Sequence, residues 1–163
     1  MAKRIALQEA VDKIHDGMTI MMGGFLGVGS AHQLIDALVA KGVKDLTIIS
    51  NDTAYPDQAH GKLVANHQVK KVIATHIGTN PETIAQKNSG ELEVELVPQG
   101  TLAECIRAAG AGLGGVLTPT GLGTIVAEGK QVDFYKVKGA GHGVRMWTPE
   151  VLDVVAQFFR AYL

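Results

Sequence analysis

A glycine-rich loop is the part of this sequence whose residue types are best suited to binding chemistry. The run Met18 to Met22 is uncharged and mostly apolar, and four glycines follow between positions 23 and 29. Ser30 then opens a helix-like run that continues to Lys41. A strand, a tight turn and a helix start in this order can point several backbone N–H groups at one anion. Such a loop suits a phosphate group, or the oxyanion that develops during acyl transfer.

Two common anion-binding motifs do not fit this loop, and a third explanation needs no ligand. The run 27–32, Gly-Val-Gly-Ser-Ala-His, lacks the third glycine of the dinucleotide fingerprint, and no lysine follows as a P-loop requires. A tight strand-to-helix turn without a ligand would also explain the glycines, because they permit positive φ and close approach. The candidate binding residues of the loop are Gly23, Gly24, Phe25, Leu26, Gly27, Val28 and Gly29.

No nucleophile accompanies the loop. The sequence has no Gly-x-Ser-x-Gly elbow, no Cys-x-x-Cys and no His-Glu-x-x-His, which excludes a zinc protease of that type. Cys105 lies in an apolar helical stretch, so we expect a small buried residue rather than a reactive thiol. For Glu82 and Glu104 we expect solvated or capping roles. The histidines are not at ligand spacing, so we predict no metal site and expect surface or helix-end positions; they are His15, His32, His60, His67, His76 and His142.

The composition favours an α/β protein. Of the 163 residues, 46% are hydrophobic, 5% are aromatic and 20 are glycine, which suits many tight connections. A net charge of -1 and the lack of a basic tract argue against nucleic-acid or anionic-membrane partners. One cysteine fits a reducing compartment. The run 1–20 lacks the long apolar core of a signal peptide, so none is expected, and no apolar run approaches about 20 residues. We therefore expect a cytoplasmic protein.

Strand-like and helix-like segments alternate along the chain, which predicts an open, mostly parallel sheet with flanking helices. The strand before the glycine loop is expected to be central and buried on both faces. Gly42 is expected at a helix C-terminus, and Pro81 at a helix start. The other expected segments are a helix over 6–15, strands over 46–49, 69–77 and 92–97, the last more exposed, and a helix over 102–109.

Polar residues follow the strand over 46–49 directly. The run Ser50 to Thr53 stands where open parallel sheets keep their ligands. Asn51 and Asp52 could bind a ligand there, or could be loop-forming residues that hydrogen-bond their own backbone. The sequence leaves both explanations open.

Several motifs together resemble the α subunit of the family I coenzyme A transferases, of the acetate or 3-oxoacid type. The signature is Asp16-Gly17 followed by Gly23-Gly24-Phe25 and Gly29, with Ala31 where the family usually has proline. The likeness spans residues 1–131 and continues through the runs 51–53, 76–83, 98–102, 111–115, 118–121 and 128–131.

This resemblance implies a function that would explain the missing nucleophile. Members move coenzyme A between an acyl-CoA and a short carboxylate or 3-oxoacid, in short-chain fatty acid and ketone-body metabolism. A glutamyl–coenzyme A thioester forms on the β subunit, so no catalytic residue is expected in this chain. The resemblance implies that the Gly23–Gly29 loop, Gln99 and Asn51 line a cleft shared with that subunit in an α2β2 assembly. Coenzyme A would be a substrate rather than a permanently bound cofactor.

The segment 132–163 resembles instead the C-terminal strand and helix of an α/β-hydrolase. His142 would match the triad histidine, but the serine elbow and the acid are missing. We thus expect a truncated transferase-like domain, 1–131, completed by a foreign tail that packs on its sheet and leaves an apolar patch for self-association. Two alternative functions remain: an inactive fusion serving as a binding or scaffold module, and, more remotely, a carboxylesterase.

Overall fold

The computed structural model describes residues 5–121 and 123–125. The chain divides into two compact units, Met1–Thr118 and Pro119–Leu163. In the second unit the described residues form a turn, in which the Thr124 hydroxyl donates to the Gly121 carbonyl over 2.6 Å. The expected tail over 132–163, with His142, lies outside the described residues.

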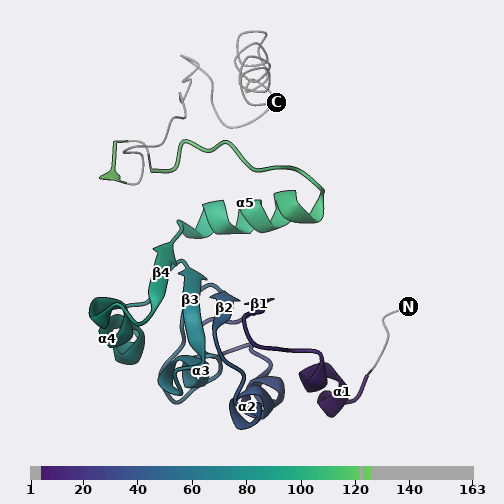
Figure 1. Ribbon diagram of the computed structural model, residues 1–163. Coiled ribbons are helices and arrows are strands. Elements are labelled where there is room, and N and C mark those ends of the chain that lie inside the picture. Colours follow the sequence, from purple (N-terminus) through teal and green to yellow (C-terminus); the bar gives the residue numbers. More distant parts are fainter. Residues whose placement is uncertain (1–4, 122, 126–163) are drawn as a thin grey trace. The chain divides into compact units, whose positions relative to one another are not determined.

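The first unit is built on a parallel sheet of four strands in the order β1-β2-β3-β4 (Figure 1). The strands are β1 (Thr19–Met21), β2 (Leu46–Ile49), β3 (Val69–Ala74) and β4 (Glu93–Leu96). Helices α1 (Leu7–Asp12), α2 (His32–Lys41), α3 (Gly61–Ala65) and α4 (Pro81–Ser89) lie in a row beside the sheet, and α5 (Gln99–Gly110) follows β4. Consecutive parallel strands joined by right-handed crossovers place their connecting helices on one face. The predicted α/β fold with an open parallel sheet is confirmed.

The core lies between the sheet and this row of helices. Ile48 and Val72 are neighbours in the register and are almost fully buried, together with Ile35 and Leu38 of α2 and Leu63 of α3. Alternate strand residues point the other way and are less buried. One strongly apolar face per strand therefore drives the packing of the crossover helices.

The other sheet face carries charge at β3 and β4. Lys71 lies opposite Glu93 in the register, and its Nζ is 2.8 Å from Glu93 Oε1 and 3.2 Å from Glu95 Oε2. Hydrogen bonds to these carboxylates raise the pKa of Lys71. The exposed alternation expected for the strand over 92–97 is thus confirmed, and it has a cross-strand partner.

The expected central position of the strand before the glycine loop is wrong. Within the described sheet β1 is an edge strand that pairs only with β2, and 53% of Met21 is exposed. Only Ile20 of β1 packs against the core. An unbroken apolar run indicates burial on both faces, but among the described residues the neighbouring strand lies on one side of β1 only.

Two helix boundaries were predicted correctly, whereas the bounds of other elements and one short helix were not. Gly42 ends α2 in the left-handed conformation with φ 73°, and Pro81 opens α4 after Asn80, whose side chain accepts from the Thr83 N–H, both as expected. The strand over 69–77 ends earlier, at Ala74, and α5 begins at Gln99 rather than at 102. Helix α3 was not predicted, because five residues are too few to show a helical period.

Candidate functional site

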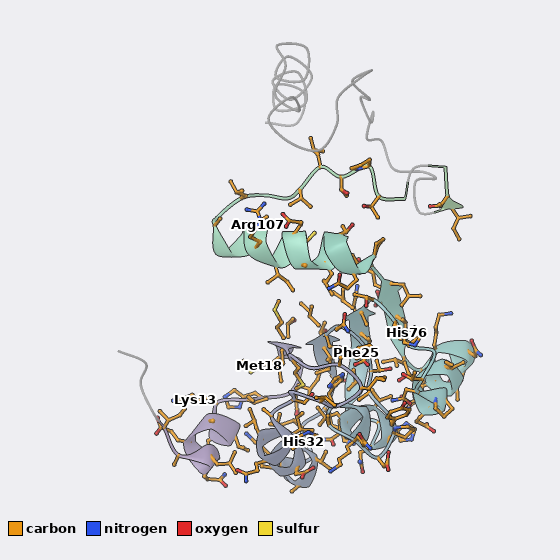
Figure 2. All side chains as sticks on the ribbon, turned by 180° about the vertical axis from the view of Figure 1, so that it is seen from behind. Lys13, Met18, Phe25, His32, His76 and Arg107 are labelled. Atoms are coloured by element: carbon orange, nitrogen blue, oxygen red, sulfur yellow. The ribbon has the colours of Figure 1, made fainter. Side chains whose placement is uncertain are left out.

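The candidate site lies at the carboxyl edge of the sheet, where the loops after β1, β2 and β3 emerge. In a parallel sheet all strands end at the same edge, so the loops over 22–31, 50–60 and 75–80 are neighbours there. Figure 2 labels Phe25 on the first of these loops and His76 on the third, both toward the ends of the strands. The predicted loop residues therefore fall where such sheets bind ligands.

The tip of the glycine loop is a tight hairpin. Phe25 and Val28 exchange two backbone hydrogen bonds of 2.9 Å each, and the residues between them, Leu26 and Gly27, have φ values of 49° and 86°. Positive φ at both central positions is the requirement of a type I′ turn. The side chains of Phe25 and Val28 are 56% and 79% exposed. The loop thus has a defined backbone and an apolar, solvent-facing tip.

The base of the loop is closed by Ser30 and needs glycine at position 24. The Ser30 hydroxyl donates to the Gly23 carbonyl over 3.1 Å. A Cβ added to Gly24, whose φ is 123°, would lie 2.2 Å from Ser30 Oγ and 3.1 Å from the Val28 carbonyl oxygen. A side chain at position 24 would therefore displace the Ser30 hydroxyl from its place and press on the Val28 carbonyl oxygen.

The free donors of the loop are its glycines. The N–H groups of Phe25, Leu26, Val28 and Ser30 are all bonded to other groups of this chain. The glycine N–H groups have no hydrogen bond within the part of the chain that the structure describes; they belong to Gly23, Gly24, Gly27 and Gly29. Four unpaired amides in seven residues is a pattern that an anionic or oxyanionic ligand can satisfy.

Asp52 anchors the hairpin from the loop after β2. Its carboxylate is fully buried; Oδ2 accepts from the Leu26 N–H over 2.7 Å, and Oδ1 accepts from the Ala54 N–H over 3.2 Å. Of the two explanations that the sequence left open for Asp52, the structure supports the loop-forming one. The bond to Leu26 crosses 26 residues of sequence, and no local pattern indicates it.

His60 is a site residue that sequence reasoning passed over. It stands at a helix end, as expected for the histidines, but only 1% of it is exposed. Its Nε2 donates to the Asp52 carbonyl over 2.6 Å and lies 3.7 Å from Asp52 Oδ1. The Nδ1 atom is buried and has no hydrogen-bond partner among the described residues. His60 thus holds the backbone of Asp52 in place and does not reach the surface.

Asn51 lies beside Asp52 and joins the loops after β2 and β3. The Thr75 hydroxyl donates to the Asn51 carbonyl over 2.6 Å and lies 3.2 Å from Asn51 Oδ1. The Asn51 side-chain NH2 has no hydrogen bond within the described residues. The predicted site residue Asn51 therefore stands next to the anchor of the glycine loop, with a donor to spare.

Gln99, the other predicted site residue, is at the far end of the same edge. It is the exposed first residue of α5, which follows β4. Strands β2 and β3 separate β4 from β1. With about 4.8 Å between strands, roughly 14 Å separate the two ends of this edge. The described chain brings Asn51 to the glycine loop and leaves Gln99 apart from it.

Two further predictions concern α5. Cys105 is exposed, so the expectation that it is buried is wrong; among the described residues of α5 only Leu102 and Ala108 are buried. Glu104 is solvated as expected, and its Oε2 lies 2.8 Å from Arg107 Nε. This hydrogen bond lowers the pKa of Glu104.

Metal-binding and membrane-spanning features are missing from the described residues. These residues contain no group of three or more histidine, cysteine, aspartate or glutamate side chains placed to hold a metal ion. None of the helices in that part of the chain has the length and apolar character needed to cross a bilayer.

Known proteins match the chain over most of its length. The family described as coenzyme A transferase matches residues 4–149. The chain is 60% identical to the alpha subunit of the acetate CoA-transferase of Escherichia coli (strain K12) over 129 residues, covering 79% of this chain and 59% of that protein. It is 46% identical to the alpha subunit of a probable coenzyme A transferase of Bacillus subtilis (strain 168) over 162 residues, covering 99% of this chain and 68% of that one.

Solved structures that are described as coenzyme A transferases share the fold. An acyl-CoA transferase from E. coli O157:H7, in a thioester complex with CoA, superposes with a TM-score of 0.65 at 29% identity, over 75% of this chain and 25% of that chain. The chain spans 59% and 68% of the length of the two bacterial relatives. The family match runs past residue 131, where the resemblance read from the sequence stops.

Proposed function

The chain belongs to the coenzyme A transferase family, and from that premise we propose that it acts as the α subunit of a short-chain acyl or 3-oxoacid CoA-transferase. Its partner would be a β subunit, in keeping with relatives whose names describe them as alpha subunits. The substrates would be an acyl-CoA and a short carboxylate or 3-oxoacid. The assembly would be α2β2.

One observation carries this proposal: four unpaired glycine N–H groups on a loop whose conformation is held by other bonds. A carboxylate of the β subunit would attack the acyl carbonyl of acyl-CoA, expel the coenzyme A thiolate and form an anhydride. The thiolate would then attack the anhydride, giving the glutamyl thioester and the free acyl carboxylate. Each attack places negative charge on an acyl oxygen, and donors fixed in advance favour that state over the ground state.

The described residues of this chain would supply binding rather than a nucleophile. The glycine amides would face the acyl oxygen or a phosphate of coenzyme A, and the Asn51 NH2 would add a side-chain donor beside them. The roughly 14 Å between strands β1 and β4, which the glycine loop and Gln99 follow, is within the length of an extended coenzyme A molecule. Gln99 would then contact another part of the substrate than the loop does.

The proposal is tested by reconstitution. The purified chain is mixed with a β subunit from a related transferase, and coenzyme A transfer from an acyl-CoA to acetate is measured. A full-length relative in place of this chain is the positive control. Transfer with both supports the proposal. Transfer with the relative alone, and no coenzyme A binding by this folded chain, would support the non-catalytic scaffold instead.

A further inference from the structure

We propose that Asp52 is a positioning residue of the glycine loop: its buried carboxylate sets the direction of the glycine N–H groups by holding the N–H of Leu26. The inference rests on the proposed function of that loop as a ligand cradle. Asp52 touches no ligand in this account. It acts on the ligand only through the conformation of the hairpin over 25–28.

The two oxygens of this carboxylate hold two residues in an unfavourable conformation. Leu26, bonded to Oδ2, has φ 49°, and Ala54, bonded to Oδ1, has φ 50°. Residues with a side chain seldom adopt positive φ, and leucine is not among those that favour type I′ turns. The hairpin therefore needs a hydrogen-bond acceptor from outside it. The Asp52 carboxylate provides one oxygen for the loop after β1 and the other for its own loop after β2.

Asp52 is itself held firmly. Its carbonyl oxygen accepts from the Ser50 hydroxyl over 2.5 Å and from His60 Nε2 over 2.6 Å. All three residues are buried, with no more than 3% exposed. With its backbone fixed in this way and its side chain fully buried, Asp52 can impose its position on the more exposed hairpin, rather than follow it.

The consequence concerns which donors remain for a ligand. With the Leu26 N–H turned toward Asp52, only the glycine amides remain unpaired among residues 23–29. Without the carboxylate, the Leu26 N–H would lose its acceptor, and the turn could relax toward negative φ. The N–H of Gly27 lies within that turn, and those of Gly24 and Gly29 lie close to it, so their directions would change with it.

The test is Asp52→Asn, which keeps the shape but leaves one acceptor atom for two N–H groups. Its matched control is Asp16→Asn, since Asp16 Oδ1 also accepts a distant backbone N–H, that of Lys44, over 2.7 Å. We measure hydrogen exchange and chemical shift of the Leu26 amide by NMR, coenzyme A affinity by calorimetry, and melting temperature. Loss of a charge-assisted bond predicts about tenfold faster exchange at Leu26 and about tenfold weaker binding in Asp52→Asn only.

A second variant separates positioning from mere stability. Leu26→Asn supplies the Asn-Gly pair that type I′ turns prefer, so it should hold the turn without help. Added to Asp52→Asn, it should restore most of the lost affinity, even if the melting temperature stays low. The inference would be overturned if Asp52→Asn bound coenzyme A with unchanged affinity, whatever the hydrogen-exchange rate of its Leu26 amide. It would also be overturned if Leu26→Asn restored none of the lost affinity.

Failure of the proposed function gives a different result. If the wild-type chain with its β subunit binds no coenzyme A, the cradle is wrong whatever Asp52 does. Hydrogen exchange of the Leu26 amide then tests by itself whether Asp52 holds the hairpin. Fast exchange in the wild type, or protection that survives Asp52→Asn, would contradict that role. If Asp52→Asn does not fold, the same question is answered by the exchange rate of the Leu26 amide in the wild type and by the coenzyme A affinity of the double variant.

Discussion

Asn51 offers a test at the scale of a single residue. Asn51→Asp keeps an oxygen for the Thr75 hydroxyl, but it replaces the unpaired NH2 with a negative charge. If that NH2 donates to an anionic substrate, coenzyme A affinity should fall about tenfold or more, through the lost hydrogen bond and the added repulsion. The melting temperature should change little, because the contact with Thr75 is preserved. Calorimetry and thermal unfolding of the same samples measure both.

The control for this prediction is Asn66→Asp. Asn66 is exposed at the end of α3, and its NH2 donates to the Lys62 carbonyl over 2.7 Å. The same change in charge there should leave coenzyme A affinity unchanged. Equal loss of affinity in the two variants would mean that net charge, rather than the Asn51 donor, governs binding.

Site residues could be predicted from the sequence where a local pattern indicates them, but their hydrogen-bond partners could not. The glycines of the loop stand out in the sequence because glycine adopts the positive φ found at Gly24 and Gly27 without strain. The bond from Leu26 to Asp52 depends on which strand lies beside β1, so no local pattern could indicate it. His60 was missed for the same reason: its burial follows from the packing of α3, a helix that was not predicted.

Helix α5 gives a prediction at the scale of an element. Glu104 and Arg107 form an i,i+3 pair on this helix, and the guanidinium holds the pKa of Glu104 below its usual value. Such a pair contributes to stability above the pKa that the carboxyl has in the unfolded chain, and the contribution is lost as pH falls through the lowered pKa. Arg107→Gln should therefore raise the pKa of Glu104, seen by NMR titration of its side-chain carboxyl. Lys13→Gln, at the end of α1, should leave it in place; no shift in Arg107→Gln would contradict the pairing.

Element type was predicted well and element position less so. The apolar run of β2 and the caps of α2 and α4 give strong local signals, since each depends on a few adjacent residues. The edge position of β1 depends on the order of strands, which apolarity does not encode. Cys105 was expected inside because its neighbours are apolar, but the described chain buries only Leu102 and Ala108 of α5.

At the scale of the whole molecule, the sheet lies within the family match, whereas the expectations for the segment 132–163 remain predictions. The family match covers 4–149, whereas the structure describes residues 5–121 and 123–125. The hydrolase-like tail, its packing on the sheet and the resulting self-association are therefore expectations from sequence. The candidate site does not depend on them, because the hydrogen bonds that build it lie within the first unit.

The central claim is that the glycine loop binds coenzyme A, and paired glycine variants test it most directly. Gly24→Val and Gly90→Val both place a β-branched residue at positive φ, a strain of about 1–3 kcal/mol, but Gly90 ends α4, away from the loop. Melting temperature and coenzyme A affinity are measured on both, with the β subunit present. The account predicts lower melting temperatures in both variants and a loss of affinity of about tenfold or more in Gly24→Val alone. Full affinity in Gly24→Val with a lowered melting temperature would contradict the cradle and leave the loop as a structural turn.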